Sequence, residues 1–206
     1  MTTSRLDAAL PAALPAARDR SAASAADVPA ARDGVAVSDV AVSGVAAALP
    51  GSADLLRSVF RRHAAGVAVI TAHGECPVGF TATSLTSVAA EPPMVSFGVG
   101  TGSSSWPVLE EAEHIGVHIL GEHQQDLAAT FARSGADRFA PPTRWRTGPE
   151  GVPLLEGVLA WLVCRVVARV PAGDHRIVIA EAVSGDPAGA GRPLLYCQGR
   201  FNALRD

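Results

Sequence analysis

The stretch "GFTATSLTSVAAEPPMVSF" (Gly79–Phe97) decides the fold class, because it joins two strand-like runs across a Pro-Pro turn. Its β-branched and aromatic residues favour strands, and Pro92 and Pro93 end the first run. Five small hydroxyl side chains crowd into seven of its positions: Thr81, Thr83, Ser84, Thr86 and Ser87. Strand packing alone does not require so many hydroxyls, so they are either ordinary strand residues or the lining of a polar ligand.

Further strand-like runs lie on both sides of this stretch. They are "GVAVITA" (66–72), "PPMVSFGV" (92–99), "HIGVHIL" (114–120), "LAWLVCRVVARV" (159–170), "HRIVIAEAVSG" (175–185) and "PLLYCQGRF" (193–201). The segment 73–77 has the composition of a hairpin turn. Six or seven short strands separated by turn signals are typical of an antiparallel barrel. The sequence therefore predicts a mainly β protein with peripheral helices.

Three segments have helical patterns. "DLLRSVFRRHA" (54–64) can be capped by Ser52 or Asp54, and its apolar residues fall on one helical face. A short helix is predicted after Ser105, because Pro107 is tolerated in a first turn. The segment 122–135 forms a third helix, which Gly135 closes. The Pro- and Gly-rich segment 137–155 is predicted to be a loop.

The composition limits the function classes. The net charge is −3, and all 17 basic residues are arginine, so the sequence offers no basic footprint for nucleic acid. No apolar run reaches the roughly 20 residues that span a bilayer. The cysteines Cys76, Cys164 and Cys197 are widely spaced, which supports neither a zinc motif nor a disulfide framework. We expect a cytoplasmic protein without a membrane partner.

The first fifty residues differ from the rest of the chain. They contain 17 alanines and no aromatic residue, so they have few large side chains with which to build a core. Charged and proline residues interrupt any apolar run that could serve as a secretory signal. We expect residues 1–50 to form a disordered extension and residues 51–206 to form the folded domain.

The Gly-rich stretch "GVGTGSSSW" (98–106) follows a strand and precedes a helix, which is the context of a phosphate cradle. It lacks the third glycine of a dinucleotide fingerprint, and the chain has no lysine for a phosphate-loop motif. Three serines remain: Ser103, Ser104 and Ser105. They are predicted either to contact an anion or simply to cap the helix.

The sequence gives little indication of a serine hydrolase or of a metal site built on histidine. No Gly-x-Ser-x-Gly motif is present, so a serine hydrolase is not indicated. His114 and His118 would lie on one face of a strand, about 13 Å apart, which is too far for a shared metal ion. We expect no metal site. His175 is different, because it precedes a long apolar strand and has Asp174 beside it to orient its ring.

The hydroxyls of the opening stretch do not separate onto one strand face. Thr81 and Thr83 alternate to one side, and Ser84 and Thr86 to the other. Small polar side chains on both faces suit a strand over which a flat heteroaromatic ring lies, while backbone groups bond its edge.

These motifs together resemble the short-chain flavin reductases that have an FMN-binding split barrel. The resemblance extends from Leu55 to the C-terminus. It is carried by "AAGVAVITA", "PVGFTATSLTSVAAEPPMVSF", "SSSWPVL", "DRF", "GDHRIVIAEA" and "PLLYCQGRF", in that order. One departure is Thr83, where many relatives carry asparagine.

The resemblance implies an antiparallel split β-barrel that reduces FMN or FAD with NADH or NADPH, NADH being the expected donor. It also implies a homodimer and a separate flavin-dependent monooxygenase that receives the reduced flavin. The implied flavin-binding residues are Gly79, Phe80, Thr81, Ala82, Thr83, Ser84, Ser103, Ser104 and Ser105. Asp174 and His175 are implied at the nicotinamide, with His175 as the catalytic candidate. Any cationic phosphate contact must come from an arginine, which the sequence does not single out.

Three alternatives stay open. The barrel could bind flavin without catalysis. It could instead act as a pyridoxamine-phosphate-oxidase-like enzyme, which would need a basic phosphate clamp that the sequence does not clearly show. It could also be an interaction domain whose alanine-rich segment binds a partner.

Overall fold

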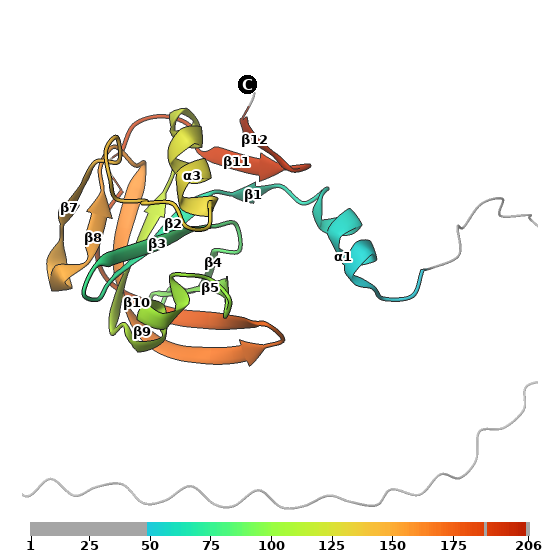
Figure 1. Cartoon of the computed structure of the whole chain (residues 1–206), viewed down its shortest axis with the longest axis horizontal. Coiled ribbons are helices and arrows are strands. Elements are labelled where there is room, and N and C mark those ends of the chain that lie inside the picture. Colours follow the sequence, from blue (N-terminus) through green and yellow to red (C-terminus); the bar gives the residue numbers. More distant parts are fainter. Residues whose placement is uncertain (1–48, 188, 205–206) are drawn as a thin grey trace, which may run out of the picture. The chain divides into compact units, whose positions relative to one another are not determined.

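The computed structural model describes residues 49–187 and 189–204. Its centre is a seven-stranded, wholly antiparallel sheet in the order β3-β2-β6-β9-β10-β5-β4 (Figure 1). In chain order these strands are β2 (Ala68–His73), β3 (Pro77–Ala82), β4 (Thr86–Ala89), β5 (Met94–Gly100), β6 (His114–Ile119), β9 (Ala160–Ala172) and β10 (His175–Asp186). The predicted mainly β, antiparallel class is confirmed.

The sheet curls so that its two edge strands, β3 and β4, are joined by only three residues, Thr83–Leu85. The part of the opening stretch before the Pro-Pro turn is therefore two strands with a break between them, and not the single strand predicted there. Gly98 lies beyond the last residue of β5 that β4 pairs, and its N–H donates instead to Ser84 Oγ at 2.9 Å. The Ser84 hydroxyl thus ties the break between β3 and β4 to β5, beyond the last pair of the β4–β5 ladder.

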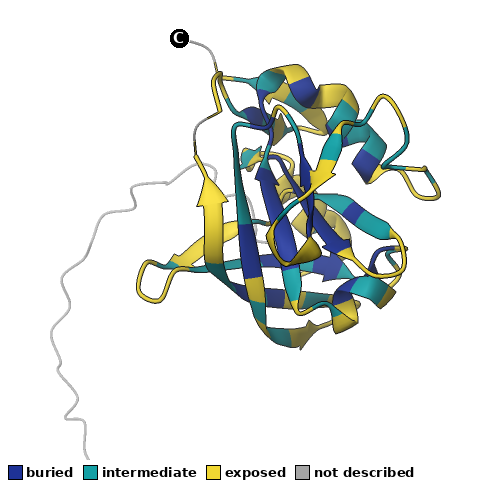
Figure 2. Cartoon of the chain, turned by 90° about the vertical axis from the view of Figure 1, so that its left-hand side faces the viewer, coloured by how far each residue is buried: buried dark blue, intermediate teal, exposed yellow. Residues whose placement is uncertain are grey.

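Strand β2 is the centre of the core, because Ala68–Ala72 are buried on both faces. One face contributes to the barrel interior and the other packs beneath the helix α3 (Gln125–Ala132). Figure 2 shows the buried residues concentrated on the strands in the middle of the domain. The barrel interior includes Ile70, Ala72, Phe97, Val99, Leu109, Ile115, Val117, Cys164 and Val178. The second cluster includes Val67, Val69, Leu120, Ala128, Phe131, Leu155 and Leu194.

Two predicted helices cover the sheet. α2 (Trp106–Glu111) begins after Ser105 with proline in its first turn, as expected, and it buries Trp106 and Leu109. The predicted segment 122–135 is a 3-10 turn, η1 (Glu122–Gln124), that continues into α3. Gly135 follows at a φ of 71°, which glycine adopts most readily. α3 packs on β3 and β2.

Helix α1 (Ala53–Phe60) is capped by Ser52, whose hydroxyl accepts a hydrogen bond from the Leu55 N–H at 3.1 Å. The predicted cap is confirmed, but the predicted apolar face is not buried against the domain. Leu56, Val59 and Phe60 are 59%, 56% and 60% exposed. The sequence pattern correctly predicts an apolar stripe on the helix, but no described part of the chain covers this stripe.

Two segments form hairpins that the sequence pattern did not resolve. The expected loop 137–155 contains β7 (Trp145–Thr147), the 3-10 turn η2 (Pro149–Gly151) and β8 (Pro153–Leu155). The expected last strand is β11 (Leu194–Cys197) and β12 (Arg200–Ala203), joined through Gln198 and Gly199 at φ 54° and 76°. This pair of positive φ angles matches a tight two-residue hairpin turn.

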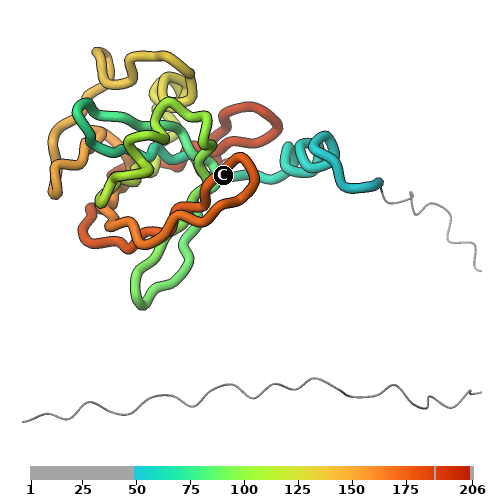
Figure 3. The backbone as a smooth tube through the Cα atoms, turned by 60° about the horizontal axis from the view of Figure 1, so that its bottom comes forward, coloured from blue at the N-terminus to red at the C-terminus, as the bar shows by residue number. Residues whose placement is uncertain are grey.

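The terminal hairpin pairs with β1 (Ala65–Gly66) in a three-stranded sheet of order β1-β11-β12. The C-terminal hairpin and the segment after α1 therefore lie side by side, as the tube in Figure 3 shows. The expected extension falls almost entirely outside the described residues. No described helix is long and apolar enough to cross a membrane.

Candidate functional site

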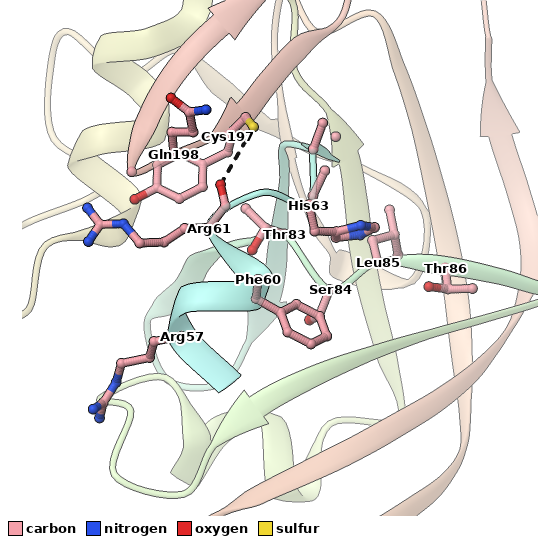
Figure 4. A pocket seen from close by; sticks show the side chains of 15 residues that line it. Arg57, Phe60, Arg61, His63, Thr83, Ser84, Leu85, Thr86, Cys197 and Gln198 are labelled. Carbon is pink, nitrogen blue, oxygen red and sulfur yellow. Dashed lines mark hydrogen bonds between the residues drawn. The ribbon is translucent and has the colours of Figure 1, made fainter. Parts of the chain in front are cut away.

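A cavity of about 860 Å³ opens where the barrel is split (Figure 4). Three parts of the chain line it: the end of α1 with the segment that follows, the Thr83–Thr86 break, and the β11–β12 hairpin. These parts are far apart in sequence, and the pairing of β1 with β11 brings them together. A cavity of this size accommodates a small-molecule cofactor.

The cavity combines hydroxyl, aromatic and cationic side chains. Thr83 and Ser84 are exposed and line the cavity together with the aromatic residues Phe60 and Tyr196. Arg57 and Arg61 are exposed and lie at the helix end. The backbone carbonyl of Arg61 holds the hairpin, because it accepts bonds from the Gln198 N–H at 2.8 Å and from the Cys197 thiol at 3.7 Å. Aromatic faces with a few polar groups suit a flat, charged ligand.

The strand β3 residues predicted at the flavin, Gly79, Phe80, Thr81 and Ala82, do not line this cavity. Ala82 is buried in the barrel interior, and the Phe80 ring packs against Phe97 with centroids 6.1 Å apart. The Thr81 hydroxyl donates to the Ala128 carbonyl of α3 at 2.6 Å. A Cβ on Gly79 would lie 2.8 Å from both a backbone oxygen of β2 and the Phe131 ring, so close packing requires glycine here.

The three serines before α2 differ from one another in their contacts. Ser105 is fully buried and its hydroxyl donates to the Gly79 carbonyl at 3.0 Å, so it links α2 to β3 and does not cap the helix. Ser103 is half-buried, and its N–H donates to the Gly100 carbonyl at 3.0 Å. Ser104 is exposed, and its hydroxyl accepts a bond from the Arg138 guanidinium at 3.1 Å.

Arg138 is the functional candidate that the sequence did not single out. Its guanidinium bonds Ser104 Oγ and the Arg133 carbonyl, but its buried Nε has no hydrogen-bond partner among the described residues. Burial lowers the pKa of Arg138 below its ordinary value. Two signals were available: Arg138 belongs to the "DRF" motif, which by itself assigns no role, and the chain has no lysine, so an arginine had to serve any anion.

Asp174 and His175 lie at the turn between β9 and β10. Nδ1 of His175 lies 2.7 Å from Oδ1 of Asp174, and this hydrogen bond holds the pKa of the Asp174 carboxyl below its ordinary value. His175 pairs with Gly100, the residue to which Ser103 bonds. The structure thus brings Asp174 and His175 next to Ser103–Ser105, which we call the serine segment. It does not include them among the residues that line the cavity at Thr83 and Ser84.

No group of three potential metal ligands occurs among residues 49–187 and 189–204. His118, one of the two strand histidines, is fully buried and bonds the Val69 carbonyl through Nδ1 at 3.1 Å. Burial lowers its pKa from 6.5 to about 4. It is a structural residue of the core.

Residues 60–205 match the model of the flavin reductase like domain family. The chain belongs to this family, and the antiparallel split barrel described above is its fold. It is 45% identical over 150 residues to an NADH:FMN oxidoreductase of Rhodococcus erythropolis, covering 70% of this chain and 78% of that one.

Two further relatives extend this likeness. The chain is 40% identical over 146 residues to the reductase component of 4-nitrophenol 4-monooxygenase/4-nitrocatechol 2-monooxygenase of Rhodococcus opacus, covering 70% of this chain and 77% of that one. It also matches an NADH:FAD oxidoreductase of Streptomyces globisporus C-1027, solved in complex with NAD and FAD fragments. That match has 34% identity and a TM-score of 0.69, and covers 73% of this chain and 91% of the other.

Proposed function

We propose that this protein is an NAD(P)H-dependent flavin reductase that supplies reduced FMN or FAD to a separate flavin-dependent monooxygenase. The observation that carries the proposal is the cavity at the split of the barrel, in a chain of the flavin reductase family. Its relatives include an NADH:FMN oxidoreductase and the reductase component of a monooxygenase, which supports NADH as the donor and an oxygenase as the recipient. We assign the activity to residues 51–206.

The described residues fit a flavin with a terminal phosphate. Thr83 and Ser84 line the cavity, where the ring system would lie against Phe60 or Tyr196, and the Ser84 hydroxyl also bonds the Gly98 backbone. Arg138 and Ser104 form a bonded pair beside Ser103, and the buried Nε of Arg138 has no acceptor among the residues that the structure describes. Buried polar groups are nearly always hydrogen-bonded, and a phosphate oxygen is a strong acceptor for a guanidinium. We therefore propose Arg138 as the arginine that holds the phosphate.

Not every residue of the expected flavin set keeps a direct role in this proposal. Five of them pack or hydrogen-bond β3 against its neighbours instead: Gly79, Phe80, Thr81, Ala82 and Ser105. We propose that they shape the strand from which Thr83 and Ser84 project.

Asp174 and His175 are proposed to orient the nicotinamide. The flavin, when bound, supplies the acceptor for the nicotinamide hydride, so the protein itself needs to supply position more than acid or base. His175 is exposed and adjacent to Gly100, so a planar ligand that enters beside the serine segment can contact its ring. The Asp174 carboxylate fixes the orientation of that ring through Nδ1.

A homodimer is part of the proposal. The apolar face of α1 (Leu56, Val59, Phe60) is exposed beside the cavity, and Phe60 lines it. A second copy that covers this face would remove a continuous apolar stripe from water. We expect the protein to sediment as a dimer, and Phe60→Ser to shift it toward the monomer; a wild-type monomer would contradict this part. A cytoplasmic location also belongs to the proposal and agrees with the three free cysteines.

The test is the oxidation of NADH and NADPH, followed by the loss of their near-ultraviolet absorbance, with FMN, FAD or no flavin added. Oxidation that depends on added flavin is the expected result, and the rates rank both donors and both flavins. A yellow protein that does not oxidise either nucleotide would point instead to a flavin-binding module without catalysis. A protein that neither binds flavin nor oxidises nucleotide would overturn the proposal.

A further inference from the structure

The turn that contains Asp174 and His175 is largely exposed, so packing does little to fix its conformation. The Asp174 and His175 side chains are 92% and 54% exposed, and the hydrogen bond between them joins two neighbours of one turn. Gly173, at a φ of 63°, begins the two-residue turn that Ala172 and His175 close. An exposed contact of this kind contributes little to order by itself. Strand pairing with Ala172 and Gly100 holds His175, so the position of Asp174 in the turn depends on contacts of its own backbone.

Thr101 makes that connection. Both its backbone N–H and its Oγ1 hydroxyl donate to the Asp174 carbonyl, each at 3.0 Å. Thr101 directly follows β5, whose last residue Gly100 pairs with His175. On the other side, Thr101 leads into the serine segment, in which the Ser103 N–H returns to the Gly100 carbonyl at 3.0 Å.

Thr101 thus links the two parts of the site whose ligands the reaction must align. The serine segment with Arg138 is the proposed phosphate side, and the turn with His175 is the proposed nicotinamide side. We propose that Thr101 is a positioning residue for the nicotinamide, acting through the Asp174 carbonyl; this inference rests on the proposed function. Two donors on one carbonyl fix both the distance and the angle of the turn, whereas the backbone donor alone leaves the angle free.

The test compares Thr101→Val, which keeps the side-chain shape and removes the hydroxyl, with Thr101→Ser, which restores the hydroxyl. Thr130→Val is the matched control, because the Thr130 hydroxyl also donates to a backbone carbonyl, that of Asp126 at 2.9 Å, but within α3. Loss of one hydrogen bond predicts a KM for NADH raised by roughly three- to tenfold in Thr101→Val. We expect the affinity for flavin to stay within about twofold of the wild type, and Thr101→Ser and Thr130→Val to keep the wild-type KM.

A second readout does not depend on activity. A pH titration of the Asp174 carboxyl carbon resonance by NMR reports the bond between Asp174 and His175. Because that bond holds the pKa of Asp174 low, a loosened turn in Thr101→Val moves the titration upward, toward an ordinary carboxyl. The titration remains informative if the wild type does not oxidise NADH, so failure of the proposed function and failure of this inference are distinguishable.

Two outcomes would overturn the inference. One is a Thr101→Val protein with the wild-type KM for NADH and the wild-type Asp174 titration. The other is an equal loss of flavin and NADH affinity, because this would mean that Thr101 merely supports the serine segment. A raised KM with unchanged flavin affinity, together with rescue by Thr101→Ser, supports it.

Discussion

Acidification is expected to destabilise the protein through His118, a fully buried histidine of β6. Its Nδ1 lies 3.1 Å from the Val69 carbonyl, which can only accept a hydrogen bond, so Nδ1 carries the proton of the neutral ring. Its Nε2 is buried without a partner among the described residues. Protonation would place a positive charge and an unsatisfied donor in the core, and burial accordingly lowers the pKa of His118 from 6.5 to about 4.

The sign follows from which state binds the proton. Below a pH of 6.5 the unfolded chain protonates this histidine, whereas the folded protein does so only near the lowered pKa of about 4. The contribution to stability is therefore complete above the unfolded pKa and is lost as the pH falls toward the folded one. At about 1.4 kcal/mol per pKa unit, the full loss is about 3 kcal/mol, of which about 2 kcal/mol is gone by about pH 5.

Urea unfolding measures this directly, with tryptophan fluorescence as the signal, since Trp145 and Trp161 pack against the core. We would compare the wild type with His118→Asn, whose amide can still donate to the Val69 carbonyl but does not titrate. His73→Asn, at the exposed last residue of β2, is the matched control. His118→Asn is expected to be less stable at neutral pH, because a smaller side chain leaves a void.

The decisive quantity is the difference in pH dependence. Between about pH 7.5 and about pH 5 the wild type and His73→Asn should lose about 2 kcal/mol more than His118→Asn. If the three proteins lose stability in parallel over this range, the buried neutral state of His118 is not the cause, and the reasoning is refuted. Limiting the range to pH values above the ordinary carboxyl pKa keeps the acidic residues from dominating the comparison.

Three further predictions concern the site and its supporting strand. His175→Ala should lower kcat/KM for NADH by about tenfold and spare flavin binding, since one positioning contact is lost; unchanged kinetics would remove His175 from the site. Arg138→Gln should weaken FMN binding by about tenfold or more, while riboflavin, which lacks the phosphate, binds equally to both proteins; Arg144→Gln, at an exposed arginine, should change neither affinity. Gly79→Ala should lower the melting temperature by several degrees, corresponding to about 1–3 kcal/mol of overpacking against β2 and α3. Gly102→Ala, with open space around it, should not, and equal effects would contradict the packing argument.

The strands were predictable wherever local chemistry dominates. The bounds of β2, β5, β6, β9 and β10 agree with the predicted apolar, β-branched runs to within two residues at each end, and Ser52 caps α1 as its side chain predicts. The missed elements are short. Strands β7 and β8 have three residues each, and β11 and β12 have four each. A run of this length is too short for its periodicity to distinguish a strand from a turn. The turn between β11 and β12 was not predicted, because Gln198 has a positive φ that non-glycine residues rarely adopt.

The candidate site was predictable in composition more than in arrangement. The sequence pointed to Thr83, Ser84 and the serine segment as polar groups within a barrel, and the structure places Thr83 and Ser84 at a cavity. Arg138 lies in the "DRF" motif, but the local pattern gave it no role, because its contact with Ser104, 34 positions earlier in the chain, forms only in the folded protein. The same holds for Thr101, whose partner Asp174 is 73 positions away.

By itself, the sequence determined the antiparallel β class, the family motifs and the residue types that a flavin site needs, because periodicity and turn chemistry are local properties. Only the tertiary structure decided which hydroxyls are free. Thr81 and Ser105 come from the same hydroxyl-rich segments as Thr83 and Ser104, yet their hydroxyls bond buried carbonyls of α3 and β3. Buried carbonyls must find donors, so long-range packing determines which side chains remain available to a ligand.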